Sequence, residues 1–278
     1  MLVQVARELA RAGVDTPELD AELLLAHSLR VERAWLVAHP EQLLTPEQTA
    51  TMRALTTRRA QREPLAYITG RRWFYDIELV VTPAVLIPRP ETEELVERAL
   101  AWLQQHPRAV VADIGAGSGA IALAVAKHAP PDVRVFATDI SAEALDVARQ
   151  NARRLGLEMR VQFRHGDLLA ALPTPVDLLL ANLPYVAERD ASNLMPEVGR
   201  FEPREALFSG PAGLEHLHRL LTQAPAFLRP GGEALLEIGW DQGDVVAGMA
   251  RQRFPRGRIQ IHKDLSGHDR IVEIEIAT

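Results

Sequence analysis

The tetrapeptide Asn182-Leu183-Pro184-Tyr185 holds the groups in this sequence that are best suited to chemistry. It directly follows residues 176–181, which are apolar apart from Asp177 and therefore predict a buried strand. In open α/β sheets, ligands bind just beyond the carboxyl ends of the strands. An amide side chain, a free backbone carbonyl and an aromatic face at such a place are suited to gripping a planar NH2 group. The candidate substrate is therefore an amide or an exocyclic amine whose nitrogen reacts.

A second group of residues has the spacing of a nucleotide site. Gly115-Ala116-Gly117-Ser118-Gly119 lies where a predicted strand turns into a helix, so the backbone can approach a ligand and the helix offers free N–H groups. Asp139 ends the next predicted strand, where a carboxylate can accept both hydroxyl groups of a ribose. The pattern fits a dinucleotide and S-adenosylmethionine equally well, and a glycine turn without a ligand is the third reading.

Two features favour S-adenosylmethionine. Asp113 comes just before the glycines, where a carboxylate suits the ammonium group of a methionine moiety but would repel a pyrophosphate. Residues 258–262 and 270–276 are alternating strands separated by only seven residues, too few for a crossover helix, so we expect this pair to be antiparallel. A terminal antiparallel pair is typical of class I methyltransferases.

With a methyl donor nearby, the tetrapeptide can act on an amide nitrogen. That nitrogen is a poor nucleophile because its lone pair is delocalised, and it must pyramidalise to accept a methyl group. The Asn182 side-chain oxygen and the Leu183 carbonyl can hold its two N–H groups in this geometry. Pro184 stiffens the turn, and Tyr185 can cover the planar group of the substrate. Catalysis is then mostly positioning, whereas the alternative is an Asn-x-Pro turn that only closes a strand.

Asp167 and Leu168 end the third predicted strand. Asp167 can accept a hydrogen bond from an adenine amine while Leu168 packs on the ring. Equally, Asp167 can be the N-cap of a short helix. The sequence leaves both interpretations open.

From residue 109 onward, predicted strands and helices alternate, which is typical of a doubly wound α/β sheet. The fold expected is a Rossmann-like, mixed sheet of seven strands, parallel apart from its terminal antiparallel pair. The strands are expected at 110–114, 133–139, 160–165, 176–181, 233–238, 258–262 and 270–276, and the helices between them at 117–128, 141–155, 212–228 and 241–254.

The N-terminal part has a different pattern. Residues 2–62 show helical periodicity, with helix starts at Thr16-Pro17 and Thr45-Pro46, and predict a bundle of four or five helices. Aromatic and β-branched residues over 67–81 predict a β-hairpin, and prolines then lead to a helix that begins near Thr92. We therefore expect a helical substrate-recognition domain at 1–66, a hairpin and proline-rich linker at 67–91, and a methyltransferase domain at 92–278.

Composition limits the partners. The net charge of −6 argues against a broad nucleic-acid footprint, so no direct nucleic-acid binding is expected. The chain has no cysteine, which excludes disulfides and thiolate chemistry, and its nine histidines show no metal spacing. No apolar run is long enough to span a membrane, and the N-terminus lacks the pattern of a signal peptide. We expect a cytoplasmic protein without a metal or a membrane partner.

Six motifs, in order along nearly the whole chain, resemble those of the release factor glutamine methyltransferases, the HemK or PrmC family. They lie at residues 64–70, 85–93, 113–119, 182–185, 201–207 and 263–270. The resemblance implies transfer of a methyl group to the side-chain nitrogen N5 of the glutamine in the Gly-Gly-Gln loop of bacterial class I peptide chain release factors. The cofactor implied is S-adenosylmethionine, with S-adenosylhomocysteine as the product.

The resemblance also assigns roles to residues. It implies that the stretch from Gly115 to Gly119, together with Asp139, binds the cofactor, with Leu168 beside adenine, and that Asn182, Leu183 and Tyr185 hold the glutamine. Residues 87–93 become a lid over the methionine end of the cofactor, although a stiff linker with a helix cap at Thr92 also explains them. One departure is clear: the family motif is Asn-Pro-Pro-Tyr, and Leu183 replaces its first proline. The carbonyl acceptor is kept, but some rigidity of the backbone is lost.

Four other functions are compatible with parts of the pattern. The glutamine of a ribosomal protein is one alternative substrate, although residues 201–207 resemble the release-factor branch more closely. An exocyclic amine of adenine or guanine in DNA or RNA is another. An NAD-dependent oxidoreductase is disfavoured by Asp113, and a cofactor-binding protein without catalysis is disfavoured by an intact Asn182.

Overall fold

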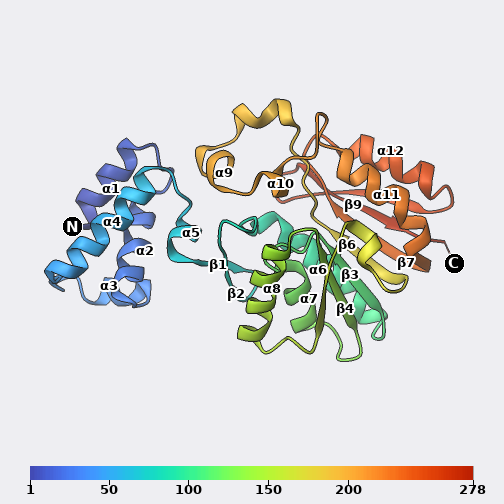
Figure 1. Cartoon of the computed structure of the whole chain (residues 1–278), viewed down its shortest axis with the longest axis horizontal. Helices are drawn as coiled ribbons and strands as arrows, with labels where there is room; N and C mark the ends of the chain where they lie inside the picture. Colours follow the sequence, from blue (N-terminus) through green and yellow to red (C-terminus); the bar gives the residue numbers. More distant parts are fainter. Residues whose placement is uncertain (278) are drawn as a thin grey trace. The chain divides into compact units, whose positions relative to one another are not determined.

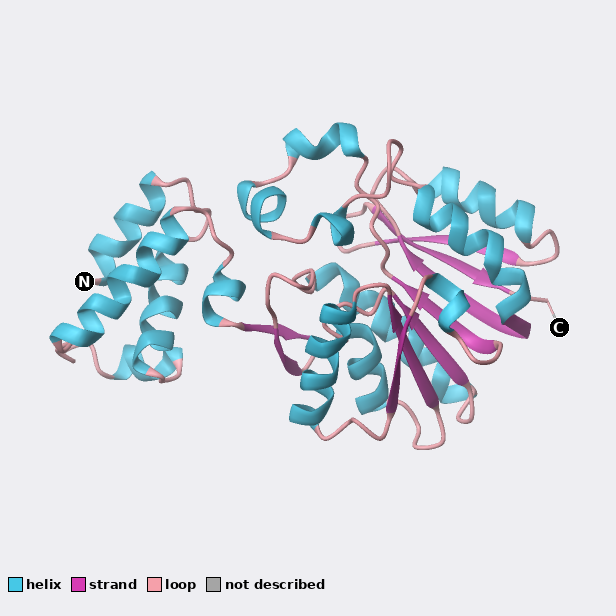
Figure 2. Ribbon diagram, in the orientation of Figure 1, coloured by secondary structure: helices cyan, strands magenta, loops and turns pink. Residues whose placement is uncertain are grey.

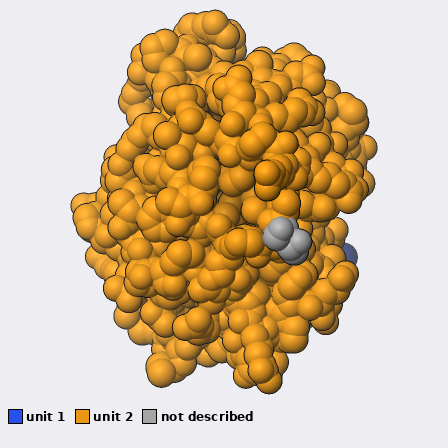
Figure 3. Space-filling model, turned by 90° about the vertical axis from the view of Figure 1, so that its right-hand side faces the viewer, with its two compact units in different colours: residues 1–71, 194–201 blue, residues 72–193, 202–278 orange. Residues whose placement is uncertain are grey.

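The computed structural model describes residues 1–277 and divides into two compact units (Figures 1 and 3). Unit 1 comprises residues 1–71 and 194–201, and unit 2 comprises residues 72–193 and the chain from 202 onward. The domain boundaries predicted after residues 66 and 91 divide the chain by the expected roles of its segments, and they stay a prediction. The compact units divide at Arg71 instead, and they add to the helical unit a segment that lies far along the chain.

Unit 1 is helical and has its own core. Leu9, Leu24 and Met52 are at most 1% exposed and pack together. Both predicted helix starts are confirmed, because α2 begins at Pro17 after Thr16 and α4 begins at Pro46 after Thr45, which forms a capping box with Gln48. The helices are α1 (Leu2–Arg11), α2 (Pro17–Leu29), α3 (Arg33–Ala38), α4 (Pro46–Ala60), α5 (Leu65–Thr69) and α9 (Pro196–Phe201).

Charged groups join α9 to the N-terminal helices. Glu197 of α9 accepts hydrogen bonds from Arg59 (2.9 Å) and from Arg62 (2.7 Å). The Arg59 guanidinium also donates to Asp20 of α2 at 2.6 Å, and the Arg59 and Asp20 side chains are 8% and 5% exposed. A buried guanidinium without its carboxylates would be strongly unfavourable. These contacts explain why residues 194–201 group with unit 1.

Asp20→Ala is expected to destabilise unit 1 by about 3 kcal/mol, because it removes one partner of a buried charge while Arg59 stays buried. Urea denaturation, followed through hydrogen exchange of the amides in residues 2–60, measures this loss. Glu22→Ala is the control, since Glu22 pairs with a half-exposed Arg33, and it should change stability by less than about 1 kcal/mol. Equal effects of the two substitutions would contradict a special role for the buried pair.

The predicted hairpin is present but shorter than expected. Its strands are β1 (Arg71–Phe74) and β2 (Ile77–Val80), whereas residues 65–69 form α5. The expectation of a strand from Tyr67 was therefore wrong. Pro64 occupies the N-cap of α5 and Gly70 ends it with a φ of +73°, so two punctuating residues define one helical turn in an otherwise β-rich sequence.

Unit 2 contains the predicted mixed sheet of seven strands, and Figure 2 shows its strands in magenta. The strand order is β5-β4-β3-β6-β7-β9-β8. All neighbours are parallel except the pairs that β9 forms with β7 and β8. The class I methyltransferase fold is thus confirmed, including the antiparallel end. The strands are β3 (Val110–Ile114), β4 (Arg134–Asp139), β5 (Val161–His165), β6 (Val176–Ala181), β7 (Leu228–Glu237), β8 (Arg258–Lys263) and β9 (Asp269–Glu275).

Helices cover both faces of this sheet, and on its central strands successive residues are buried against opposite faces. On β3, Val111 faces a core formed with α6 (Glu93–Gln105), α7 (Ala120–His128) and α8 (Ala142–Leu155). Its neighbours Val110 and Ala112 face a second core formed with α11 (Glu215–Phe227) and α12 (Gly243–Arg253). The short helices η1 (Pro90–Thr92), η2 (Leu168–Ala171), η3 (Glu188–Asn193) and α10 (Arg204–Leu207) lie in connections.

Two predicted helices begin three residues later than expected. The helix predicted from 117 begins at Ala120, and the one predicted from 212 begins at Glu215. Gly117, Gly119 and Gly213 have φ of +53°, +84° and +77°, which a right-handed helix cannot contain. Within residues 1–277, the structure has no helix that is both long and apolar enough to cross a membrane.

Candidate active site

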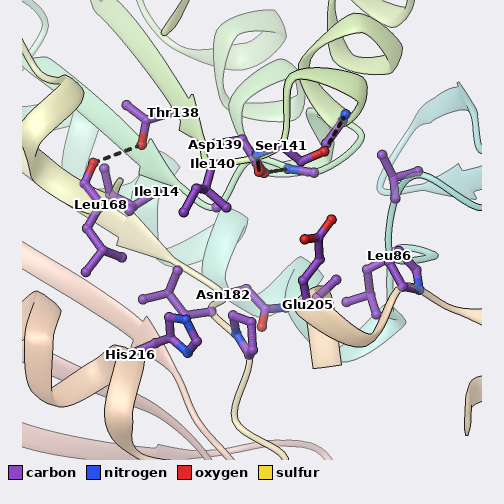
Figure 4. Close-up of a pocket in the computed structure, with 18 of the residues that line it drawn as sticks. Leu86, Ile114, Thr138, Asp139, Ile140, Ser141, Leu168, Asn182, Glu205 and His216 are labelled. Atoms are coloured by element: carbon purple, nitrogen blue, oxygen red, sulfur yellow. Dashed lines mark hydrogen bonds between the residues drawn. The ribbon is translucent and has the colours of Figure 1, made fainter. Parts of the chain in front are cut away.

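A cleft opens at the carboxyl ends of the central strands, all within unit 2 (Figure 4). The chain order of the sheet reverses at β3, which lies between β4 and β6, and this is the switch point where ligands bind in such sheets. The loops after β3, β4, β5 and β6 all contribute to the lining. The cleft has about 790 Å³ of empty space including its open mouth.

The glycine loop and the tetrapeptide are in direct contact. The Gly115 and Ala116 amides donate to the Thr138 carbonyl at 2.9 Å, which fixes the loop beside β4. Gly115 has a φ of +78°, and a Cβ at this position would lie 2.9 Å from Leu183 Cδ2 and 3.7 Å from the Asn182 carbonyl oxygen. The positive φ therefore favours glycine here, and a larger residue would also have to displace the Leu183 side chain. Leu183, which replaces the first proline of the family motif, is itself buried against Gly115.

Asp139 contributes a carboxylate to the lining of the cleft. Its Oδ2 accepts from the Gly117 amide at 2.8 Å, and its Oδ1 accepts from the Ser141 amide at 2.9 Å. Burial raises the pKa of this carboxyl, and the hydrogen bonds from Ser141 and Gly117 oppose that rise. The geometry fixes both oxygens while leaving each a second lone pair for a ligand hydroxyl.

Not every predicted cofactor residue reaches the cleft. Gly115, Gly117, Asp139, Asp167, Leu168 and Asn182 line it. In the part of the chain that the structure describes, Ala116, Ser118 and Gly119 stand outside this lining. The Ser118 carbonyl accepts from the Asn151 side chain, and a Cβ at Gly119 would meet Leu123 at 3.0 Å, so these two positions serve the packing of α7 and α8.

Asp113 does not occupy the place expected for it. It is fully buried, and its Oδ2 accepts from the Ala122 amide in the first turn of α7 at 3.0 Å. Burial raises its pKa to about 7. Its carboxylate lies outside the lining of the cleft that the described residues form. The contact expected with a ligand ammonium group stays a prediction, while Asp113 Oδ2 holds the start of α7 through the Ala122 amide.

Asp167 and Leu168 both line the cleft. Asp167 occupies the N-cap of η2 without a side-chain cap hydrogen bond, and it forms an ion pair with Arg219 instead. The N-cap alternative is thus wrong as far as its side chain is concerned. Leu168 has a φ of +48°, a conformation rare for leucine that occurs at ligand sites, and its carbonyl accepts from Thr138 Oγ1.

The tetrapeptide is held from several sides. Asn182, Leu183 and Pro184 line the cleft, and Leu183 is 4% exposed in the core of the sheet. The Tyr185 carbonyl accepts from Gln242 Nε2 at 3.0 Å, and a Cβ at Gly213 would lie 2.4 Å from the same carbonyl. These contacts fix the backbone from which the side chains project.

Tyr185 is the one member of the tetrapeptide outside the lining formed by residues 1–277. Burial raises the pKa of its phenol to about 12, and the charge of Glu237 adds to this effect while those of Arg270 and Arg89 oppose it. The phenol is therefore neutral at physiological pH and lies among charged groups of other elements.

Several lining residues were missed by the sequence analysis. Ile140 and Ser141 directly follow Asp139. Val85, Leu86 and Glu205 belong to motifs that the sequence analysis gave no role in this cleft, and Ala84 directly precedes one of them. His216 had no sequence signal at all. Its Nδ1 lies 2.6 Å from Ser209 Oγ, and burial, together with Arg219, lowers its pKa. No group of three or more potential metal ligands occurs within the described residues.

The comparisons with known proteins agree with this architecture. Two family models match, the PrmC N-terminal domain over residues 1–70 and the methyltransferase small domain over residues 96–198. The ribosomal protein L11 methylase of Lactobacillus delbrueckii subsp. bulgaricus shares the fold, with a TM-score of 0.52 and 22% identity over 71% of this chain and 84% of that one.

Full-length relatives are more specific. The chain is 44% identical to the release factor glutamine methyltransferase of Moorella thermoacetica, over 97% of this chain and 95% of that protein. It is 45% identical to the enzyme of the same name from Bordetella pertussis, over 92% and 93%. With both its domains matched at this level of identity, the chain belongs to the release factor glutamine methyltransferase family.

Proposed function

We propose that this enzyme transfers a methyl group from S-adenosylmethionine to N5 of the glutamine in the Gly-Gly-Gln loop of bacterial class I peptide chain release factors. One observation carries the proposal: the glycine loop and Asn182-Leu183 touch each other within a single cleft that also contains Asp139. A cofactor held by the loop would thus lie next to the groups suited to gripping an amide. We expect the reaction to take place in the cytoplasm, where these factors act.

The cleft fits the cofactor in three respects. Asp139 keeps a free lone pair on each oxygen for the ribose hydroxyls. At Gly117, no atom lies within 4 Å of the place where a Cβ would be, so the loop is open toward a ligand. Leu168 offers an apolar surface for adenine, beside the Asp167 carboxylate. When bound, S-adenosylmethionine supplies its methyl group from a positively charged sulfur.

The residues of the tetrapeptide then act on the glutamine. The Asn182 side-chain oxygen and the Leu183 carbonyl accept the two N–H groups, which directs the nitrogen lone pair along one line. The charge that develops on the nitrogen is stabilised by these two acceptors. No basic side chain is required, because the nitrogen becomes acidic once it is alkylated and its proton can pass to water. Leu183 contributes through its backbone, so its side chain is free to pack on Gly115.

Recognition of the release factor requires more surface than one side chain offers. We propose that the helices of unit 1 bind the release factor away from its glutamine, since the PrmC N-terminal domain model matches residues 1–70. An exocyclic amine in nucleic acid would fit the same acceptors. The net charge of −6 makes such a substrate the less favoured of the two.

The test is an assay with the methyl group of S-adenosylmethionine labelled. Purified release factor, the same factor with its Gly-Gly-Gln glutamine replaced by alanine, and nucleic acid are offered separately. We expect label only on the unaltered release factor. Label in nucleic acid and none on the glutamine would refute the proposal.

A further inference from the structure

Thr92 lies at the start of α6 but does not cap that helix. It occupies the N-cap position and its side chain makes no cap hydrogen bond. Instead, the Thr92 hydroxyl accepts a hydrogen bond from Asn182 Nδ2 at 3.0 Å, although the two residues are 90 positions apart. Thr92 is only 4% exposed. The hydroxyl therefore serves the tetrapeptide and not its own helix.

Glu237 approaches the same amide from the end of β7. Glu237 is 1% exposed, and its carboxyl group lies beside the polar side chains of Thr92 and Asn182. Burial raises its pKa to about 7. The side chains of Thr92 and Asn182 and the charge of Arg270 oppose the rise, while Glu91 adds to it. Thr92 and Asn182 thus favour the ionised form of the carboxyl group, and in that form it can only accept a hydrogen bond.

Together these contacts determine which way the Asn182 amide points. The Asn182 NH2 group donates to Thr92, and the Glu237 carboxyl group lies beside the same amide, so Oδ1 is left for a ligand. A hydroxyl alone would tolerate either orientation, because it can donate as well as accept. A flipped amide would place Oδ1 against the carboxylate, and two acceptors repel each other. Glu237 therefore selects the orientation and Thr92 completes it.

We propose that Thr92 and Glu237 are positioning residues that hold the Asn182 amide with its oxygen directed at the substrate nitrogen. This inference rests on the proposed role of Asn182 in gripping the glutamine. It gives a function to a residue of the 87–93 motif and to a buried acid that the transfer itself does not use. A preorganised acceptor does not have to reorient when the substrate arrives, which is where its catalytic advantage lies.

Stability alone does not account for the carboxylate. Glu237 Oε2 is buried and has no hydrogen-bond partner within residues 1–277. A buried charge with one unsatisfied oxygen destabilises the folded state, and an apolar side chain of similar size would avoid this effect. The group is thus unfavourable for folding but suited to orienting an amide.

Two matched pairs of variants test the proposal. Thr92→Val removes only the hydroxyl, and Thr92→Ser keeps it; Glu237→Leu removes the acceptor, and Glu237→Gln keeps one acceptor oxygen. We expect kcat for release-factor methylation to fall by about 10- to 100-fold in the Val and Leu variants. The KM for release factor and the Kd for S-adenosylmethionine should change by less than about threefold. The Ser and Gln variants should recover most of the lost rate.

Thermal unfolding and cofactor binding of each variant show that it is folded, so that a loss of rate is not a loss of structure. Wild-type kcat in both the Val and the Leu variants would overturn the proposal. So would Ser and Gln variants as slow as Val and Leu, because packing would then matter and hydrogen bonding would not. Asn182→Ala distinguishes a failure of the proposed function from a failure of the positioning role. If this variant keeps full turnover, the proposed role of Asn182 in gripping the glutamine itself fails. If it is inactive while all four variants are normal, only the positioning role fails.

Discussion

Asn182→Ala is expected to slow methyl transfer to release factor by about 10²- to 10³-fold, the usual effect of removing one preorganised group at a developing charge. The amide oxygen would no longer hold one N–H of the glutamine, and the nitrogen could rotate away from the line of transfer. Thr92 and Glu237 would lose the group that they orient. Single-turnover rates at saturating cofactor report this step directly.

Cofactor binding should be largely spared in this variant, because Asp139, Gly117 and Leu168 remain in place. The Kd for S-adenosylmethionine is expected to rise by less than about tenfold, the effect of at most one lost contact. Asn193→Ala is the matched control, since Asn193 is exposed in η3 and lies outside the lining of the cleft. Near-normal turnover of Asn182→Ala would mean that the tetrapeptide is only a turn that closes a strand.

The elements that position this site follow from local patterns. Strands β3 and β6 have the bounds predicted for them, because each is a short apolar run that ends at a turn signal. Strand β7 begins at Leu228, five residues before its predicted start. The prediction was late because Pro230 and two glycines indicate a turn. The extended backbone continues through them beside a register shift in its pairing with β6.

Other features depend on residues that are far apart in the sequence. Helix α9 joins unit 1 through Glu197 and two arginines of α4 and its following turn, separated by about 135 positions, and no periodicity reveals such a pair. In the same way, Thr92 and Glu237 have ordinary local explanations, a helix cap and the end of a strand. Only the folded chain places both beside Asn182. The sequence could therefore identify the acceptor but not the groups that orient it.

Asp139→Asn is expected to weaken the binding of S-adenosylmethionine by about 100-fold, which corresponds to the loss of one charge-assisted hydrogen bond. The carboxylate accepts from the Gly117 and Ser141 amides through different oxygens. An asparagine has one acceptor oxygen, so its NH2 group would face one of these amides and disturb the loop. It would also present a donor where a ribose hydroxyl needs an acceptor. Isothermal titration with S-adenosylmethionine or S-adenosylhomocysteine measures the change.

The same carboxylate makes a pH-dependent prediction. Burial raises the pKa of Asp139, so its protonation begins at a higher pH than for an ordinary aspartate. Cofactor affinity should therefore be complete above this raised pKa and decline as the pH falls through it. The decline should be absent in Asp139→Asn, which has no proton to gain, and preserved in Asp146→Asn, whose side chain is 77% exposed on α8. If the Asp139 variant bound as tightly as the unaltered enzyme at neutral pH, the ribose would have to lie elsewhere in the cleft, and the glycine loop would lose its partner in holding the cofactor.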